Sequence, residues 1–301
     1  MLTILFTAGG FNQQKFSFIK VAEKPDRLRS EDLADPQKAR PLIEKKNKWI
    51  SGNPPVQWSV KSDDDLDLYA DFFRASSHLY VIAVHGYLGD RSTMYCESSV
   101  FSDWNFNILI PDDRAHGKSQ GNWIGMGWLD SKDLLKWIEK ITDEDKDARI
   151  VLYGVSMGGA TVMMASGLDL PSNVKCIIED CGYSSVYDEF AFILKHYVHL
   201  NRWPFLFSMN IASKPVAGYG LKEASSLSML EKTNLPMLFI HGTADTFVPY
   251  YMLEKNVNAY NGPYAQVLSV EGAEHAQSYF MQPELYSQTL HDFIFRFINE
   301  D

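Results

Sequence analysis

A serine between glycines, an aspartate and a histidine are the residues of this sequence best suited to chemistry. Ser156 lies in Gly-Val-Ser-Met-Gly at 154–158, Asp245 follows 89 positions later, and His275 follows after a further 30. A serine hydroxyl is a weak nucleophile unless a base removes its proton, and that base needs an acid to orient it. The three residue types therefore predict acyl transfer, with Ser156 as nucleophile, His275 as general base and Asp245 as the orienting acid.

The segments around Ser156 fit this role. A buried-type strand over 149–153 precedes the motif, and small residues typical of a helix start follow it. Glycines two positions before and after the serine permit the sharp strand-to-helix turn called a nucleophile elbow. The new helix N-terminus and the backbone N–H of Met157 would stabilise negative charge on a substrate carbonyl oxygen. We expect Met157 to be one oxyanion-hole donor and Tyr87, after the strand 79–84, to be the second.

Asp245 and His275 each follow a predicted strand, at 237–240 and 265–270 respectively. Catalytic groups in open α/β sheets gather at the carboxyl ends of the strands, so the two residues could converge with Ser156. Asp180, at the end of the strand 174–178, is an alternative acid because it could reach the same histidine. We favour Asp245, whose loop directly follows a strand.

The other histidines fit structural positions better. His85 and His116 lie in loops that they could brace, and His241 comes too early in its loop to act as the base. His196 and His199 have a spacing on a predicted helix that could seat a metal, but no carboxylate or cysteine partner is evident. We expect no metal and no cofactor.

Short apolar strands alternate with amphipathic segments along most of the chain. Strand-type runs occupy 56–60, 66–73, 79–84, 107–111, 149–153, 174–178, 237–240 and 265–270, and helical periodicity marks 128–141 and 285–298. Such alternation predicts an α/β fold with a mostly parallel sheet and helices on both faces. The first two runs flank the acidic turn 62–65 and are predicted to form a hairpin.

The chain divides into an N-terminal extension, 1–55, which we predict to be irregular, and one domain, 56–301. A segment at about 187–227 interrupts the strand pattern and has apolar residues at helical spacing, so we predict a helical cap there. A cap could exclude water and supply an apolar acyl site. Its candidate pocket residues, with one from the acid loop, are Phe190, Leu194, Tyr197 and Phe247.

The composition and net charge limit the classes of molecule that the protein is expected to bind. The 301 residues are 46% hydrophobic with a net charge of −10, which predicts a globular protein and disfavours nucleic acid. The apolar residues 1–10 are too short for a membrane span. We expect a cytoplasmic protein that acts on a small-molecule acyl substrate; the alternative is a cell-surface or membrane-anchored protein with a longer N-terminus. Nothing in the sequence indicates the oligomeric state.

Six stretches in one order resemble the α/β-hydrolase superfamily, most closely its bacterial branch near the prolyl-oligopeptidase-like and cinnamoyl/feruloyl-esterase-like hydrolases. They lie at 84–89, 111–119, 154–159, 179–184, 240–249 and 272–275. The resemblance implies a serine hydrolase without a cofactor. It places Ser156, Asp245 and His275 at the catalytic triad, and the N–H groups of Tyr87 and Met157 at the oxyanion hole.

The expected reaction is hydrolysis of carboxylic esters, with thioesters or acyl-peptides as further substrates, through an acyl-enzyme on Ser156. Three alternatives stay open: an acyltransferase or a peptidase using the same triad, and a non-catalytic binding protein on the same fold. The presence of nucleophile, base and acid together argues against the last.

Overall fold

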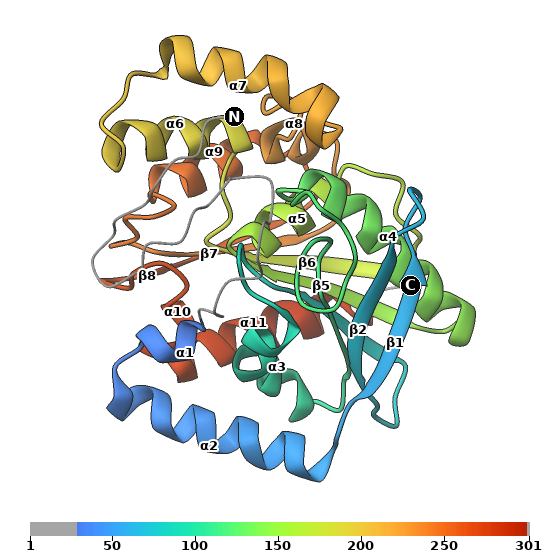
Figure 1. The fold of residues 1–301 in the computed structure, drawn as a ribbon. Helices are drawn as coiled ribbons and strands as arrows, with labels where there is room; N and C mark the ends of the chain where they lie inside the picture. The colour runs from blue at the N-terminus through green and yellow to red at the C-terminus, as the bar shows by residue number, and fades with distance from the viewer. Residues whose placement is uncertain (1–28, 300–301) are drawn as a thin grey trace.

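The computed structural model describes residues 29–299, which fold around one eight-stranded sheet (Figure 1). The strand order is β1-β2-β4-β3-β5-β6-β7-β8, and β2 runs antiparallel to both of its neighbours while the other pairs are parallel. The predicted α/β fold with a mostly parallel sheet is confirmed. The strands are β1 Val56–Lys61, β2 Asp67–Phe73, β3 Leu79–Val84, β4 Asn107–Pro111, β5 Arg149–Val155, β6 Val174–Asp180, β7 Met237–Gly242 and β8 Ala265–Val270.

Helices cover both faces of the sheet because successive strand residues point to opposite sides. Val151 and Tyr153 of β5 join a core cluster with α2, α3, α10 and α11, whereas Ile150 and Leu152 join one with α4, α5, α8 and α9. The helices on the first face are α2 Pro36–Gly52, α3 Tyr95–Ser102, α10 Ser278–Met281 and α11 Pro283–Phe297. Those on the second are α4 Trp128–Glu144, α5 Met157–Ala165, α8 Ser226–Leu230 and α9 Tyr251–Ala259; the short helices α1 Ser30–Leu33 and η1 Arg91–Met94 complete the fold outside the cap.

The segment before β1 differs from the prediction of an irregular extension, which is wrong for residues 36–52. Helix α2 begins at Pro36, and the side chain of Asp35 accepts a hydrogen bond from the N–H of Gln37 at its start. Ala39 is buried on the first face and Trp49 packs against the same cluster. The charged residues at 44–46 obscured this apolar face in the sequence. Residues 1–28, with the apolar stretch on which the localisation rests, lie outside the described part of the chain.

The predicted cap region is helical and lies between β6 and β7. Helix α6, Val186–His196, packs against α7, Arg202–Ala217, and Figure 1 shows α7 as the outermost layer with α6 between it and the sheet. Ser185 and Ser225 pair across the base of this segment as an isolated antiparallel bridge. The chain therefore leaves and rejoins the sheet at neighbouring points.

Within residues 29–299, none of the helices combines the length and the apolar character needed to cross a bilayer.

Candidate active site

Ser156 occupies a strained turn between β5 and α5. Its φ is 59° and its ψ −117°, a conformation uncommon for a residue with a side chain. Its N–H donates to the carbonyl of Asp180 at 2.8 Å, and its own carbonyl accepts from the N–H of Ala160 at 3.0 Å. These two bonds fix the turn between the strand and the helix.

The glycines flanking Ser156 are required by close backbone approaches. A Cβ on Gly154 would lie 2.1 Å from the carbonyl oxygen of Gly158, and a Cβ on Gly158 would lie 2.0 Å from that of Val84. Any side chain at either position would therefore displace backbone. The two glycines let α5 begin directly against the ends of β3 and β5.

The structure joins Ser156, His275 and Asp245 in one hydrogen-bonded chain. His275 Nε2 lies 2.8 Å from Ser156 Oγ, and His275 Nδ1 lies 2.7 Å from Asp245 Oδ2. The side chain of His275 is 23% exposed, whereas that of Asp245 is fully buried. The residues extend from the carboxyl ends of β5, β8 and β7, so the sheet edge positions all three.

Asp245 is held as an ionised acceptor. Its Oδ1 accepts from the N–H groups of Phe247 and Val248, both at 2.9 Å, and its Oδ2 lies 3.4 Å from His241 Nε2. Burial favours the neutral acid, but electrostatic attraction to the His275 ring and the hydrogen bonds from His241 and His275 outweigh it, so the pKa of Asp245 lies well below its usual range. The carboxylate can therefore orient the histidine ring through Nδ1–H.

Asp180, the alternative acid, is engaged elsewhere. Its Oδ2 accepts a hydrogen bond from the hydroxyl of Tyr286 at 2.9 Å, and burial raises its pKa to about 6. Sequence reasoning missed the next residue, Cys181, whose Sγ lies within 4.8 Å of a carboxylate oxygen of Asp245 and a ring nitrogen of His275. Burial raises the pKa of this thiol, which keeps it neutral. Its only signal in the sequence is its place directly after the strand-end carboxylate.

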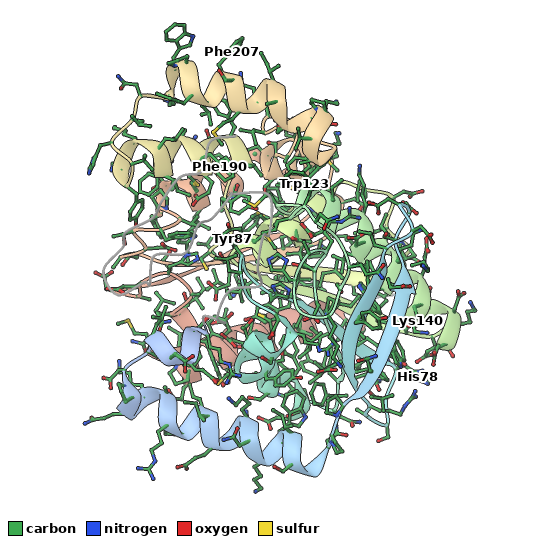
Figure 2. The ribbon with its side chains drawn as sticks, viewed as in Figure 1. His78, Tyr87, Trp123, Lys140, Phe190 and Phe207 are labelled. Carbon is green, nitrogen blue, oxygen red and sulfur yellow. The ribbon has the colours of Figure 1, made fainter. Side chains whose placement is uncertain are left out.

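The loop after β3 passes beside the serine. A Cβ on Gly86 would lie 3.2 Å from Ser156 Cβ and 3.6 Å from Ser156 Oγ, so the backbone leading to Tyr87 runs next to the hydroxyl. Met157 is the first residue of α5, and its N–H has no acceptor within its own helix. Figure 2 shows Tyr87 between the cap and the sheet, and burial raises its pKa.

Two histidines hold this loop, in line with the structural positions expected of them. His85 Nδ1 donates to the carbonyl of Gly86 at 2.8 Å, and His85 Nε2 accepts from the N–H of Asp113 at 3.0 Å. His116 Nε2 accepts from the N–H of Leu88 at 3.3 Å. Burial lowers the pKa of His85, so the ring stays neutral and can accept.

The four candidate pocket residues divide into two pairs. Phe190 and Leu194 are both 2% exposed and belong to the core cluster that joins α6 to α5 (Figure 2 labels Phe190). Tyr197 donates its hydroxyl to the carbonyl of Thr246 at 2.9 Å, and the Phe247 ring lies 5.0 Å from that of His275. Phe247 is thus the candidate in direct contact with the histidine.

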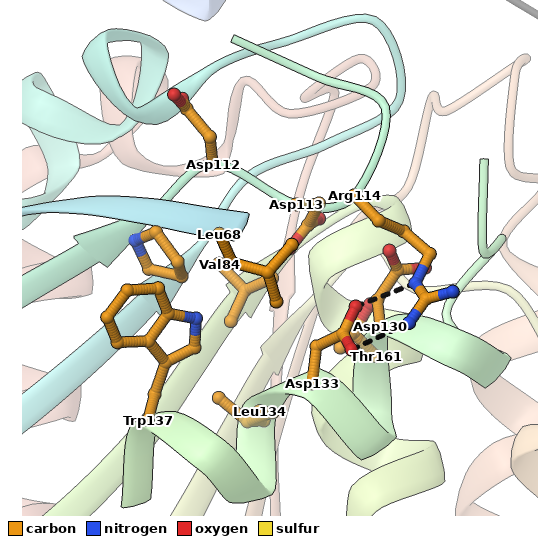
Figure 3. A pocket seen from close by; sticks show the side chains of 11 residues that line it. Leu68, Val84, Asp112, Asp113, Arg114, Asp130, Asp133, Leu134, Trp137 and Thr161 are labelled. Carbon is orange, nitrogen blue, oxygen red and sulfur yellow. Dashed lines mark hydrogen bonds and ion pairs between the residues drawn. The ribbon is translucent and has the colours of Figure 1, made fainter. Parts of the chain in front are cut away.

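A buried charged cluster lies under the loop that contains His116 (Figure 3). Nε and Nη2 of Arg114 bind the two carboxylate oxygens of Asp133, each at 2.7 Å, and Arg114 also reaches Asp64 at 3.0 Å. Burial raises the pKa of the neighbouring Asp130 to about 7. The cluster ties the loop after β4 to α4.

The alpha/beta hydrolase fold family matches residues 80–236, just over half of the chain. This protein belongs to that family. The α/β-hydrolase is 28% identical to the uncharacterised protein YqkD of Bacillus subtilis, over 71% of this chain and 70% of that protein. It is 26% identical to the uncharacterised protein YfhR of Escherichia coli K12, over 73% of this chain and 71% of that protein.

Solved structures share the fold of this α/β-hydrolase. The Pyrococcus furiosus esterase Pf2001 superposes with a TM-score of 0.67 at 21% identity, covering 82% of this chain and 94% of that chain. A puromycin-hydrolysing peptidase of Mycobacterium tuberculosis gives a TM-score of 0.65 at 20% identity, covering 83% of this chain and 40% of that chain. The predicted resemblance to α/β-hydrolases with esterase- and peptidase-like relatives is confirmed, and family and fold together support a hydrolase.

Proposed function

We propose that this α/β-hydrolase is a serine hydrolase that cleaves carboxylic esters of small molecules through an acyl-enzyme on Ser156. The observation that supports the proposal is the hydrogen-bonded chain from Ser156 Oγ through His275 to Asp245, with distances of 2.8 and 2.7 Å. A nucleophile, a base and an ionised orienting acid in this geometry are what acyl transfer requires.

In the first step His275 Nε2 takes the Ser156 proton while Oγ attacks the ester carbonyl carbon. The carbonyl π electrons move to oxygen, and the backbone N–H groups of Met157 and Tyr87 stabilise that oxyanion. Asp245 stabilises the imidazolium that forms and holds Nδ1–H in place. The tetrahedral intermediate then collapses, and His275 returns the proton to the departing alcohol.

In the second step water attacks the acyl-enzyme. His275 takes a proton from the water, a second oxyanion forms in the same hole, and Ser156 leaves with the returned proton. The same two steps apply to thioesters and acyl-peptides, which differ in the leaving group. The apolar ring of Phe247 against His275 favours an acyl or aromatic group beside the triad.

The test is labelling of the purified protein with a fluorophosphonate probe and mass spectrometry of the modified peptide. Wild type is expected to be labelled at Ser156, and Ser156→Ala and His275→Ala are expected not to react. Ser208→Ala, an exposed serine on α7, is the matched control and should label like wild type.

Turnover of short acyl esters is the second measurement. Ser156→Ala should lower kcat by on the order of 10⁶-fold, the usual cost of removing a serine nucleophile. Wild-type turnover by Ser156→Ala, or no labelling of folded wild type, would contradict the proposal. Product analysis with a competing alcohol acceptor separates transfer from hydrolysis.

A further inference from the structure

The charge of the cap differs in sign from that of the protein. The chain has a net charge of −10, yet residues 190–222 contain no Asp or Glu. The next residue, Glu223, pairs with Lys214 at 2.9 Å. The part of the cap at 190–222 thus presents cationic side chains from an anionic protein; they are Lys195, Arg202 and Lys222, besides the paired Lys214, with His196 and His199 beside them.

The outer face of α7 is apolar and exposed. Trp203 is 76% exposed, Phe207 59% and Ile211 58%. Phe207 and Ile211 lie four residues apart on the regular part of the helix, and Trp203, whose backbone is not helical, lies directly before that part. Figure 2 shows Phe207 on the side of α7 remote from the sheet. A neighbouring face of the helix packs inward through Leu206 and Ala217, which are buried. We call Trp203, Phe207 and Ile211 the α7 stripe.

The cations lie around the α7 stripe. Arg202 directly precedes Trp203 in the chain, and Lys214 lies three residues after Ile211 on the same helix, next to it on the helix surface. Lys195 lies in the last turn of α6, which packs against α7, and is exposed. A helix with aromatic and aliphatic residues on one side and Lys and Arg as its only charges is suited to the interface of an anionic bilayer.

We propose that the outer surface of the cap binds an anionic lipid surface, with the α7 stripe inserted among the lipids and the surrounding cations contacting the headgroups. This goes beyond ester hydrolysis and does not depend on it. It would bring the loops of the triad, to which Tyr197 of the cap is bonded through Thr246, close to substrates held in a membrane.

A second copy of this chain is a poorer occupant of the α7 stripe. An interface related by two-fold symmetry places the same patch against itself. The flanking cations, Lys195 and Arg202 among them, would then face their own copies with no Asp or Glu in residues 190–222 to pair with them. An anionic lipid surface instead offers acyl chains to the apolar residues and negatively charged headgroups to the cations.

Co-sedimentation with vesicles tests the proposal on the full-length protein. Wild type is expected to bind vesicles of phosphatidylcholine with phosphatidylglycerol, to bind phosphatidylcholine alone weakly or not at all, and to be released by added salt. The fluorescence of Trp203 should shift to shorter wavelength on binding, and Trp203→Phe should lose that shift.

Two pairs of variants separate the apolar and charged parts. Phe207→Ser with Ile211→Ser should lower the partition coefficient at least about tenfold, because two inserted apolar side chains are lost. The matched control is Val267→Ser with Leu285→Ser, whose residues are 45% and 48% exposed outside the cap and should have no effect. Thermal unfolding verifies that each variant is folded.

Charge reversal at Lys195→Glu with Arg202→Glu should lower binding to anionic vesicles by about fivefold per cation lost. Arg40→Glu with Lys48→Glu on α2, at the other end of the molecule (Figure 1), is the control and should leave binding unchanged. Three results would overturn the proposal: no binding by wild type, equal binding to neutral vesicles, or a dimer in sedimentation that Phe207→Ser with Ile211→Ser abolishes.

Discussion

The hydroxyl of Tyr286 donates to Oδ2 of Asp180 at 2.9 Å, which distinguishes the two carboxylates that follow β6 and β7. Tyr286 also lies 2.9 Å from the hydroxyl of Tyr153, so Asp180 ends a buried chain of hydroxyls on the α11 side of the sheet. Its backbone carbonyl holds the N–H of Ser156. Asp180 therefore supports the serine turn, whereas Asp245 contacts the histidine ring.

This difference predicts unequal effects of two matched substitutions. Asp245→Asn should lower kcat for ester hydrolysis by about 10⁴-fold, because the amide no longer selects the correct tautomer of His275. Asp180→Asn should lower it by less than about tenfold, since no contact with the ring is lost. Steady-state kinetics on a short acyl ester measures both effects. Equal losses of kcat in the two variants would contradict the assignment of the orienting role to Asp245.

The close approach at Gly86 predicts a loss of rate through the oxyanion loop. In Gly86→Ala the added methyl would lie 3.2 Å from Ser156 Cβ, so the backbone before Tyr87 must shift. We expect kcat to fall about 10- to 100-fold with little change in KM, because in the proposed mechanism the N–H of Tyr87 stabilises the developing oxyanion. Gly52→Ala, where no atom lies within 4 Å, is the control and should retain wild-type kinetics.

The Arg114 cluster predicts a large loss of stability. Arg114→Gln removes the bidentate partner of Asp133, whose side chain is 6% exposed, and leaves a buried carboxylate unpaired. The free energy of unfolding should fall by about 3–5 kcal/mol. Arg40→Gln breaks an exposed pair with Glu44 and should cost less than about 1 kcal/mol. Urea unfolding measures the two, and a small effect at Arg114 would contradict this role.

The buried Glu97 predicts that stability falls as pH rises. Burial raises its pKa from 4.5 to about 8, so between these values the unfolded chain loses a proton that the folded chain keeps. The folded state then binds more protons, and the free energy of unfolding decreases with pH across this range.

Glu97→Gln should remove that contribution. The free energy of unfolding of Glu97→Gln should exceed that of wild type only slightly near pH 4.5, and by on the order of 3–5 kcal/mol at about pH 8. Urea unfolding across this pH range provides the measurement. The control, Glu284→Gln, changes an exposed residue and should run parallel to wild type. Parallel curves for Glu97→Gln as well would show that Glu97 ionises normally in the folded protein.

Local signals in the sequence were enough for the strands and for the approach of Ser156, Asp245 and His275. Each of these residues follows a strand of a parallel sheet, and such strand ends meet at one edge. Asp245 is favoured over Asp180 on a local signal, the strand directly before its loop. What holds Asp180 away from the histidine ring is not local: it is Tyr286, which lies 106 positions from Asp180 and reaches it through packing of α11.

Buried charge was the least predictable feature. Charged residues are expected at the surface, and the aspartates of the acidic turn 62–65 are exposed in line with that rule. Their partner Arg114, which bonds to Asp64 across 50 positions, is buried, and no local signal indicates that pairing. Helix α2 was missed for a related reason, because a dense run of lysines concealed the single face on which it packs.

The bridge between Ser185 and Ser225 holds the two ends of the cap beside each other. Segments of different length could therefore join β6 to β7 at this point, provided that they cover the apolar side of α5 against which α6 packs. The three residues of the hydrogen-bonded chain follow β5, β7 and β8, outside the exchanged segment. Exchange of this one continuous stretch of sequence could thus change which substrates or surfaces the protein binds, while the same three residues stay in place.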